Sequence, residues 1–119
     1  MSRKILIVDD NPNMSSLLSE MLEVFDYESV RAADGIEAIE KVEQNDISMV
    51  ITDMRMPKMS GLDLLQKIKA KKPHLPVVVI SGYALDEEGS NLLSNLADGF
   101  LNKPFKMADI ERLLKQVVG

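Results

Sequence analysis

Short apolar or β-branched runs alternate with helical patterns along the chain. The runs span Ile5–Val8, Glu28–Ala32, Met49–Thr52, Val77–Ser81 and Phe100–Asn102. Two of them, "MVIT" and "VVVI", are continuously apolar or β-branched, as expected for strands that are buried on both faces. Strand and helix patterns follow one another five times, which predicts a parallel sheet with helices on both of its faces.

Four segments between these runs place apolar residues on one side of a helix, at spacings of three and four. The predicted faces are Met14, Leu17, Leu18, Met21, Leu22 and Phe25; Ile36, Ile39 and Val42; Leu62, Leu65 and Ile68; and Ile110, Leu113, Leu114 and Val117. A further segment, "DEEGSNLLSNL", is a weaker helix candidate because glycine, serine and asparagine are poor helix formers.

Helix start signals precede three of these segments. Asn11 is a predicted N-cap with Pro12 at the first helical position. The stretches "SGLD", which starts at Ser60, and "DGIE", which starts at Asp34, resemble capping boxes. Because parallel crossovers are right-handed, few topologies remain. We predict the flavodoxin-like doubly wound (βα)5 fold, with strand order 2-1-3-4-5 and a ligand crevice beyond the carboxyl ends of strands 1 and 3.

The composition suits one soluble domain over residues 1–119, with 45% hydrophobic and 28% charged residues. No apolar run approaches the ~20 residues of a membrane span, and "MSRK" does not resemble a signal peptide, so we expect a cytoplasmic protein without membrane contact. Cysteine is absent and His74 is the single histidine, which excludes disulfides and thiolate chemistry and disfavours histidine metal clusters. A net charge of -5 disfavours direct nucleic-acid binding.

Acidic residues follow two strands that are neighbours in the predicted order. Asp9 and Asp10 come after the first strand, and Asp53 after the third. Taken alone, the Asp9–Asp10 pair could be part of a helix N-terminus, and Asp53 could be an acid in a turn. Because both are predicted to border the same crevice, a common site is favoured. Two carboxylates about 4 Å apart repel by roughly 4 kcal/mol at an effective dielectric constant near 20. Three aspartates at one site must therefore be neutralised by protons or by a bound cation. Carboxylate oxygens without histidine or cysteine suit Mg²⁺.

Polar residues also end the fourth and fifth strands, at Ser81 and Lys103. A lone lysine or serine is ordinarily a surface or turn residue. Together with the acids and a cation, however, a hydroxyl and an ammonium at the same sheet edge can stabilise a phosphoryl group during its transfer. An aspartate can itself be the nucleophile in such a reaction.

Four ordered motifs carry a family resemblance: "ILIVDD", "ITDMRMPKMSGLDLL", "VVVISGYA" and "GFLNKPF". Together they resemble the receiver domain of two-component response regulators over nearly the whole chain. The resemblance implies a phosphoacceptor domain rather than a turnover enzyme, in which Asp53 takes a phosphoryl group from a sensor histidine kinase or a phosphotransfer protein. It also implies that the face made by the fourth helix, fifth strand and fifth helix controls an output partner or domain.

The resemblance assigns roles to individual residues. Asp10, Asp53 and the backbone carbonyl of Arg55 would ligate Mg²⁺ directly, and Asp9 would act largely through water. Ser81 and Lys103 would contact the phosphoryl oxygens. Phe100 would swing inward with the shift of Ser81, and the peptide bond before Pro104 would be cis.

The chain departs from common receiver patterns at a few positions. Phe100 stands where tyrosine is frequent. Arg55 and Tyr83 occupy positions that influence hydrolysis of the aspartyl phosphate, and neither is an acid or amide that would orient a water. We therefore expect a comparatively long-lived phosphoryl state.

The sequence fits three other functions less well or leaves them as alternatives. A haloacid-dehalogenase-type phosphatase needs a second acid two residues after the nucleophile, where this chain has Arg55. A flavodoxin-like flavin binder needs hydroxyls and amides after the first strand rather than "DDNPN". A receiver-like interaction module that works without phosphorylation is the main alternative. Since the chain ends at Gly119, directly after the last predicted helix, we expect either a stand-alone receiver or one cut from a longer regulator.

Overall fold

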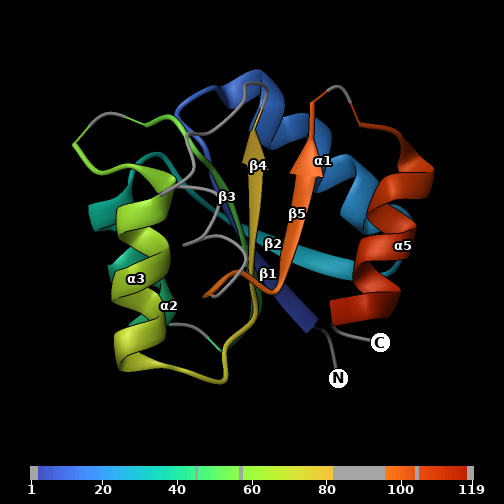
Figure 1. Ribbon diagram of the computed structural model, residues 1–119. Helices are drawn as coiled ribbons and strands as arrows, with labels where there is room; N and C mark the ends of the chain where they lie inside the picture. Colours follow the sequence, from blue (N-terminus) through green and yellow to red (C-terminus); the bar gives the residue numbers. More distant parts are fainter. Residues whose placement is uncertain (1–2, 45, 57, 82–95, 104, 118–119) are drawn as a thin grey trace.

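The computed structural model describes residues 3–44, 46–56, 58–81, 96–103 and 105–117 (Figure 1). Its described part forms a five-stranded, fully parallel sheet in the order β2-β1-β3-β4-β5. The strands are β1 (Arg3–Val8), β2 (Tyr27–Ala32), β3 (Ile47–Asp53), β4 (Val77–Ser81) and β5 (Gly99–Asn102). The predicted strand order is confirmed, and the predicted strand bounds agree with these to within two residues.

Helices cover both faces of the sheet, as predicted (Figure 1). Helices α1 (Pro12–Val24) and α5 (Met107–Val117) pack on one face, and α2 (Gly35–Gln44) and α3 (Gly61–Lys71) on the other. The further helix predicted within "DEEGSNLLSNL" lies outside the described residues except for Leu96, and Tyr83 and the peptide bond before Pro104 also lie outside them.

The strand side chains alternate between two cores. Ile5 and Ile7 of β1 face the α1/α5 side, whereas Leu6 and Val8 face the α2/α3 side. All four side chains are at most 1% exposed. Because successive strand residues point to opposite faces, a strand with helices on both sides must be apolar at every position, which explains the continuous run "ILIV".

The helix caps form where the sequence predicts them. Asn11 Oδ1 accepts hydrogen bonds from the backbone N–H groups of Asn13 (2.9 Å) and Met14 (3.4 Å), with Pro12 opening α1. Asp34 Oδ1 accepts from the N–H of Glu37 at 2.8 Å. Ser60 Oγ accepts from the N–H of Asp63 at 3.2 Å. Each contact satisfies a backbone donor that has no partner within its helix.

Two residues of the predicted apolar helix faces are exposed rather than buried. Leu17 is 43% exposed, because it lines an open cleft with Met14 rather than packing on the sheet. Ile36 is 52% exposed, because the buried side of α2 runs through Ala38 and Val42 and leaves Ile36 on the opposite side.

The strand register brings the polar residues at the carboxyl ends to one edge of the sheet. Val8 pairs with Thr52, so Asp9 and Asp53 follow at the same level. Asp53 in turn pairs with Ile80, and Ser81 pairs with Asn102, which immediately precedes Lys103. The predicted crevice is therefore where the acids and the lysine converge.

Candidate functional site

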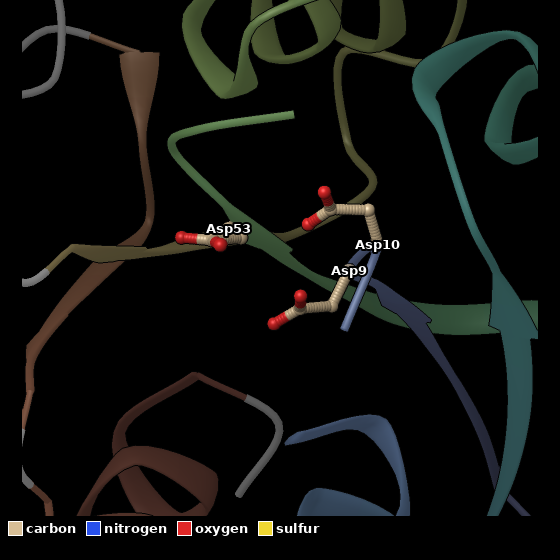
Figure 2. A group of neighbouring side chains, drawn as sticks. All are labelled: Asp9, Asp10 and Asp53. Carbon is tan, nitrogen blue, oxygen red and sulfur yellow. The ribbon is translucent and has the colours of Figure 1, made fainter. Parts of the chain in front are cut away.

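Three carboxylates converge at the carboxyl ends of β1 and β3 (Figure 2). One oxygen of each of Asp9, Asp10 and Asp53 lies within 4.8 Å of the others. Their surroundings differ: Asp9 is buried, Asp53 is half-buried and Asp10 is exposed. The predicted convergence of these three acids is thus seen in the structure.

The carboxyl of Asp9 has a raised pKa. Burial contributes most, because desolvation disfavours the charged form, and the nearby charges of Asp53 and Asp10 act in the same direction. A hydrogen bond from the N–H of Asn11 to Asp9 Oδ1 (2.9 Å) and the charge of Lys103 partly oppose this shift. A cation bound among the three acids would favour the charged form of Asp9.

Lys103 places a positive charge at this edge of the sheet. Its Nζ atom lies 3.5 Å from Asp53 Oδ2, with 29% of the lysine side chain and 13% of the aspartate side chain exposed. One ammonium beside three carboxylates leaves an excess of negative charge. The donors are hard oxygens without histidine or cysteine, so the residues present fit a Mg²⁺ ion.

Two open clefts flank the acids and the lysine. One has a volume of about 200 Å³ and is lined by Asp9, Asp10, Ser15, Arg31 and Glu37 among others. The other, of about 320 Å³, is lined by Met14, Leu17, Lys103 and Phe105. A ligand could therefore approach the carboxylates from solvent without any movement of the described backbone.

The support of Asp53 was not predicted from the sequence. The buried hydroxyl of Thr52 donates to the backbone carbonyl of Asp53 at 3.0 Å. The N–H of Gly61 donates to the carbonyl of Met54 at 2.9 Å. This hydrogen bond closes the loop that follows Asp53. The sequence signal that could have pointed to this role is the position of Thr52, a polar residue at the end of the buried run "MVIT".

The other predicted site residues are described by their strand positions and exposure. Arg55 is exposed, two positions after Asp53, and Phe100 is 40% exposed on β5. Ser81 is the last residue of β4, but its hydroxyl lies outside what the structure describes.

Comparison with known proteins identifies the family. The family model of the response regulator receiver domain matches residues 5–115. The chain belongs to this family. Among its relatives, chemotaxis protein CheY-3 of Vibrio cholerae is 33% identical over 96% of the chain and 90% of its own length. The transcriptional regulatory protein PhoP of Bacillus subtilis, which is named for alkaline phosphatase synthesis, is 30% identical over 99% of the chain.

Some relatives are much longer than this receiver domain. The chain spans 49% of PhoP, and it spans 12% of the sensor histidine kinase RcsC of Escherichia coli, to which it is 36% identical over 92% of the chain. Receiver domains therefore occur both in regulators and within sensor kinases.

Solved structures share the fold. A response regulator receiver domain protein from Clostridium thermocellum superposes with a TM-score of 0.89 at 30% identity, covering 98% of this chain and 94% of its own. The response regulator TrrA of Thermotoga maritima, solved in complex with Mg(2+)-BeF, gives 0.87 at 33% identity, covering 97% and 98%.

Membership of the family carries general consequences. Receiver domains are signalling domains of two-component systems rather than turnover enzymes, they partner with histidine kinases and phosphotransfer proteins, and they bind Mg²⁺ at an acidic site. None of the helices that the structure describes is long and apolar enough to cross a membrane.

Proposed function

We propose that this receiver domain is the phosphoacceptor of a two-component phosphorelay and that Asp53 takes the phosphoryl group. The observation that carries the proposal is the position of Asp53, half-buried between a lysine ammonium at 3.5 Å and two further carboxylates. An aspartate with only a structural role has no need of a nearby lysine together with two further carboxylates that repel it. The donor is a phosphohistidine on a sensor histidine kinase or a phosphotransfer protein.

The chemistry follows from the groups present. A carboxylate oxygen of Asp53 attacks phosphorus, the P–O bond forms, and the P–N bond to the donor histidine breaks with its electron pair going to nitrogen, which then takes a proton from water. Asp53 needs no general base, because its carboxylate is already the nucleophilic form. One open cleft is lined by Asp9 and Asp10 and the other by Lys103, so the donor side chain can approach the groups beside Asp53 from solvent.

Charge neutralisation is shared between the chain and a cation. Asp10, Asp53 and the backbone carbonyl of Arg55 would hold Mg²⁺ directly, with Asp9 acting through water. When bound, Mg²⁺ supplies positive charge beside the phosphoryl oxygens. Lys103, which follows the carboxyl end of β5, supplies the second positive charge, and the hydroxyl of Ser81 would donate to a phosphoryl oxygen.

The output would follow from β5 and the elements beside it. We infer that Ser81 shifts toward the phosphoryl group and that Phe100 moves inward, which alters the face that β5 and α5 share with the helix predicted before β5. Phe100 is 40% exposed in this structure, so an inward movement of its ring would bury it further. A cytoplasmic location, where histidine kinases present their phosphoryl groups, belongs to the same proposal.

The test is phosphorylation by a small donor. The purified chain is incubated with Mg²⁺ and acetyl phosphate, and the intact protein is weighed. We expect one phosphoryl mass gain in the wild type and in Asp63→Asn, which neutralises an exposed acid on α3. We expect none in Asp53→Asn.

One result would favour the interaction module that works without phosphorylation: the absence of a mass gain in the wild type, together with the absence of beryllofluoride binding. A gain that persists in Asp53→Asn would instead overturn the assignment of Asp53, because it would place the modification on another residue.

A further inference from the structure

The backbone of Asp53 is enclosed on two sides. On one side, the Thr52 hydroxyl donates to the Asp53 carbonyl oxygen at 3.0 Å, from a side chain with no exposed surface. On the other side lies Gly61, the buried first residue of α3. A Cβ atom added to Gly61 would lie 2.4 Å from this same oxygen and 2.9 Å from the Cα of Met54.

This contact is with backbone, which has little freedom to move. Met54 donates its N–H to the carbonyl of Ile80 at 3.0 Å, which ties it to β4, while Asp53 pairs with Ile80 in the sheet. Non-bonded carbon and oxygen atoms do not approach to 2.4 Å, so any side chain at position 61 must displace either the start of α3 or the Asp53–Met54 peptide. Glycine permits the close approach.

The same glycine closes the loop that follows Asp53. Its N–H donates to the Met54 carbonyl at 2.9 Å, so the segment that leaves β3 at Met54 comes back to Met54 at Gly61. Arg55, whose carbonyl is a proposed metal ligand, is the first residue inside this loop. Gly61 therefore restrains both the residue that carries the nucleophile and the residue that carries the carbonyl ligand.

We propose that Gly61 and Thr52 are positioning residues for the phosphoacceptor site, holding the Asp53 peptide so that its carboxylate and the Arg55 carbonyl face one cation. The inference rests on the proposed phosphoacceptor role. The Cα atom of Asp53 lies in the planar peptide group that carries this carbonyl, so a displacement of the group also moves the atom from which the Asp53 side chain extends. Loss of groups that orient metal ligands weakens metal binding by about 10-fold to 100-fold.

The experiment compares Gly61→Ala with Gly99→Ala. Gly99 opens β5, and its added Cβ would meet the end of the Leu113 side chain at 2.8 Å, which can rotate away, rather than backbone. Three quantities are measured at a temperature well below unfolding: the Mg²⁺ dissociation constant by calorimetry, the rate of phosphoryl mass gain from acetyl phosphate, and the amide NMR shifts of Asp53, Met54 and Arg55 without metal.

For Gly61→Ala we expect at least tenfold weaker Mg²⁺ binding, slower mass gain and displaced amide shifts at these three residues, with Gly99→Ala close to wild type in all three. A folded Gly61→Ala that stays within twofold of wild type in Mg²⁺ affinity and rate overturns the inference and leaves the proposed function standing. If the wild type neither binds Mg²⁺ nor gains the phosphoryl mass, the proposed function fails and the inference fails with it.

A second pair of variants serves if Gly61→Ala does not fold. Thr52→Val keeps the side-chain shape without the hydroxyl, and Thr52→Ser keeps the hydroxyl. We expect about tenfold weaker Mg²⁺ binding in Thr52→Val and recovery in Thr52→Ser. Equal affinities in these two variants would overturn the positioning role, because a purely structural effect would not depend on the hydroxyl.

Discussion

Lys103 Nζ lies 3.5 Å from Asp53 Oδ2, although their strands, β5 and β3, are separated in the sheet by β4. The lysine side chain therefore extends across the end of β4 to reach the acid. In this position it can neutralise charge on a group attached to Asp53, which a lysine directed to solvent could not do.

Replacing this lysine tests its role in phosphoryl transfer. In Lys103→Met we expect phosphorylation by acetyl phosphate to slow on the order of 100-fold, because a positive donor aimed at the developing charge is lost. The measurement is the rate of mass gain with Mg²⁺ present. Lys106→Met removes an exposed lysine nearby and should retain the wild-type rate. An unchanged rate in Lys103→Met would contradict the assigned role.

Mg²⁺ should stabilise the folded chain against heat. Three carboxylates within 4.8 Å repel one another in the metal-free protein, and a cation that binds only the folded state adds about 2.7 kcal/mol at a concentration about 100 times its dissociation constant. Thermal unfolding with increasing Mg²⁺ measures this effect. The rise in melting temperature should be largely lost in the double variant Asp10→Asn/Asp53→Asn. If that variant responds like the wild type, the cation binds elsewhere.

Acid should weaken the cap of α2. The N–H of Glu37 and then the charge of Lys58, whose Nζ lies 3.6 Å from Asp34 Oδ2, hold the pKa of Asp34 below its ordinary value of 3.8. Since the folded-state pKa is the lower one, this stabilisation is present above the ordinary pKa and is lost as the pH falls through the folded-state pKa.

The variant Asp34→Asn separates charge from capping, because asparagine also caps helices. We expect it to be less stable than wild type at pH 7, with the difference shrinking toward pH 3. Urea unfolding at both pH values measures the difference, and NMR titration of the Asp34 carboxyl gives its pKa directly. A constant stability difference across this range would refute the electrostatic explanation.

A structural cross-link joins three elements on the side of the sheet away from the site. Asp98 Oδ2 accepts from Lys69 Nζ at 2.6 Å and from the N–H of Val77 at 2.9 Å, while Lys69 Nζ also donates to the carbonyl of Leu75 at 2.9 Å. We expect Asp98→Ala to lower the free energy of unfolding by about 1–2 kcal/mol, measured with urea, because a charged acceptor is lost from a backbone donor.

The control for this cross-link is an exposed ion pair. Glu111 Oε1 and Lys115 Nζ lie 3.3 Å apart on α5, with 51% and 77% of their side chains exposed. We expect Glu111→Ala to change stability by no more than about 0.5 kcal/mol. Equal losses in the two variants would show that the burial of Lys69 and the contact with Val77 add nothing.

The lifetime of the phosphoryl group is a further prediction. Arg55 is exposed beside the site and cannot orient an attacking water as an acid or amide would. We therefore expect the phosphorylated chain to persist well beyond seconds after the donor is removed, as followed by intact mass. Arg55→Glu should shorten the lifetime, and complete loss within seconds in the wild type would contradict the prediction.

Local patterns in the sequence are enough to predict the fold and the convergence of three acids at one edge of its sheet. Continuous runs such as "ILIV" define strands buried on both faces, and their alternation with amphipathic helices leaves one common topology. That topology alone brings Asp9, Asp10 and Asp53 to one sheet edge, because parallel strands end on the same side. The caps at Asn11, Asp34 and Ser60 were likewise predictable, since capping is a local interaction.

The packing of the elements, by contrast, sets how these groups are oriented and which residues support them. Periodicity assigned Leu17 and Ile36 to the apolar sides of their helices, whereas the helix orientations leave both exposed. Asp9 and Asp10 differ in burial because of the way the helices pack around them. The position of Lys103 beside Asp53, and that of Gly61 against the Asp53 carbonyl, likewise depend on how one element packs on another. Hydrophobic patterning reports which side of an element is buried, but it carries no information about distances between elements, and those distances set the chemistry of this site.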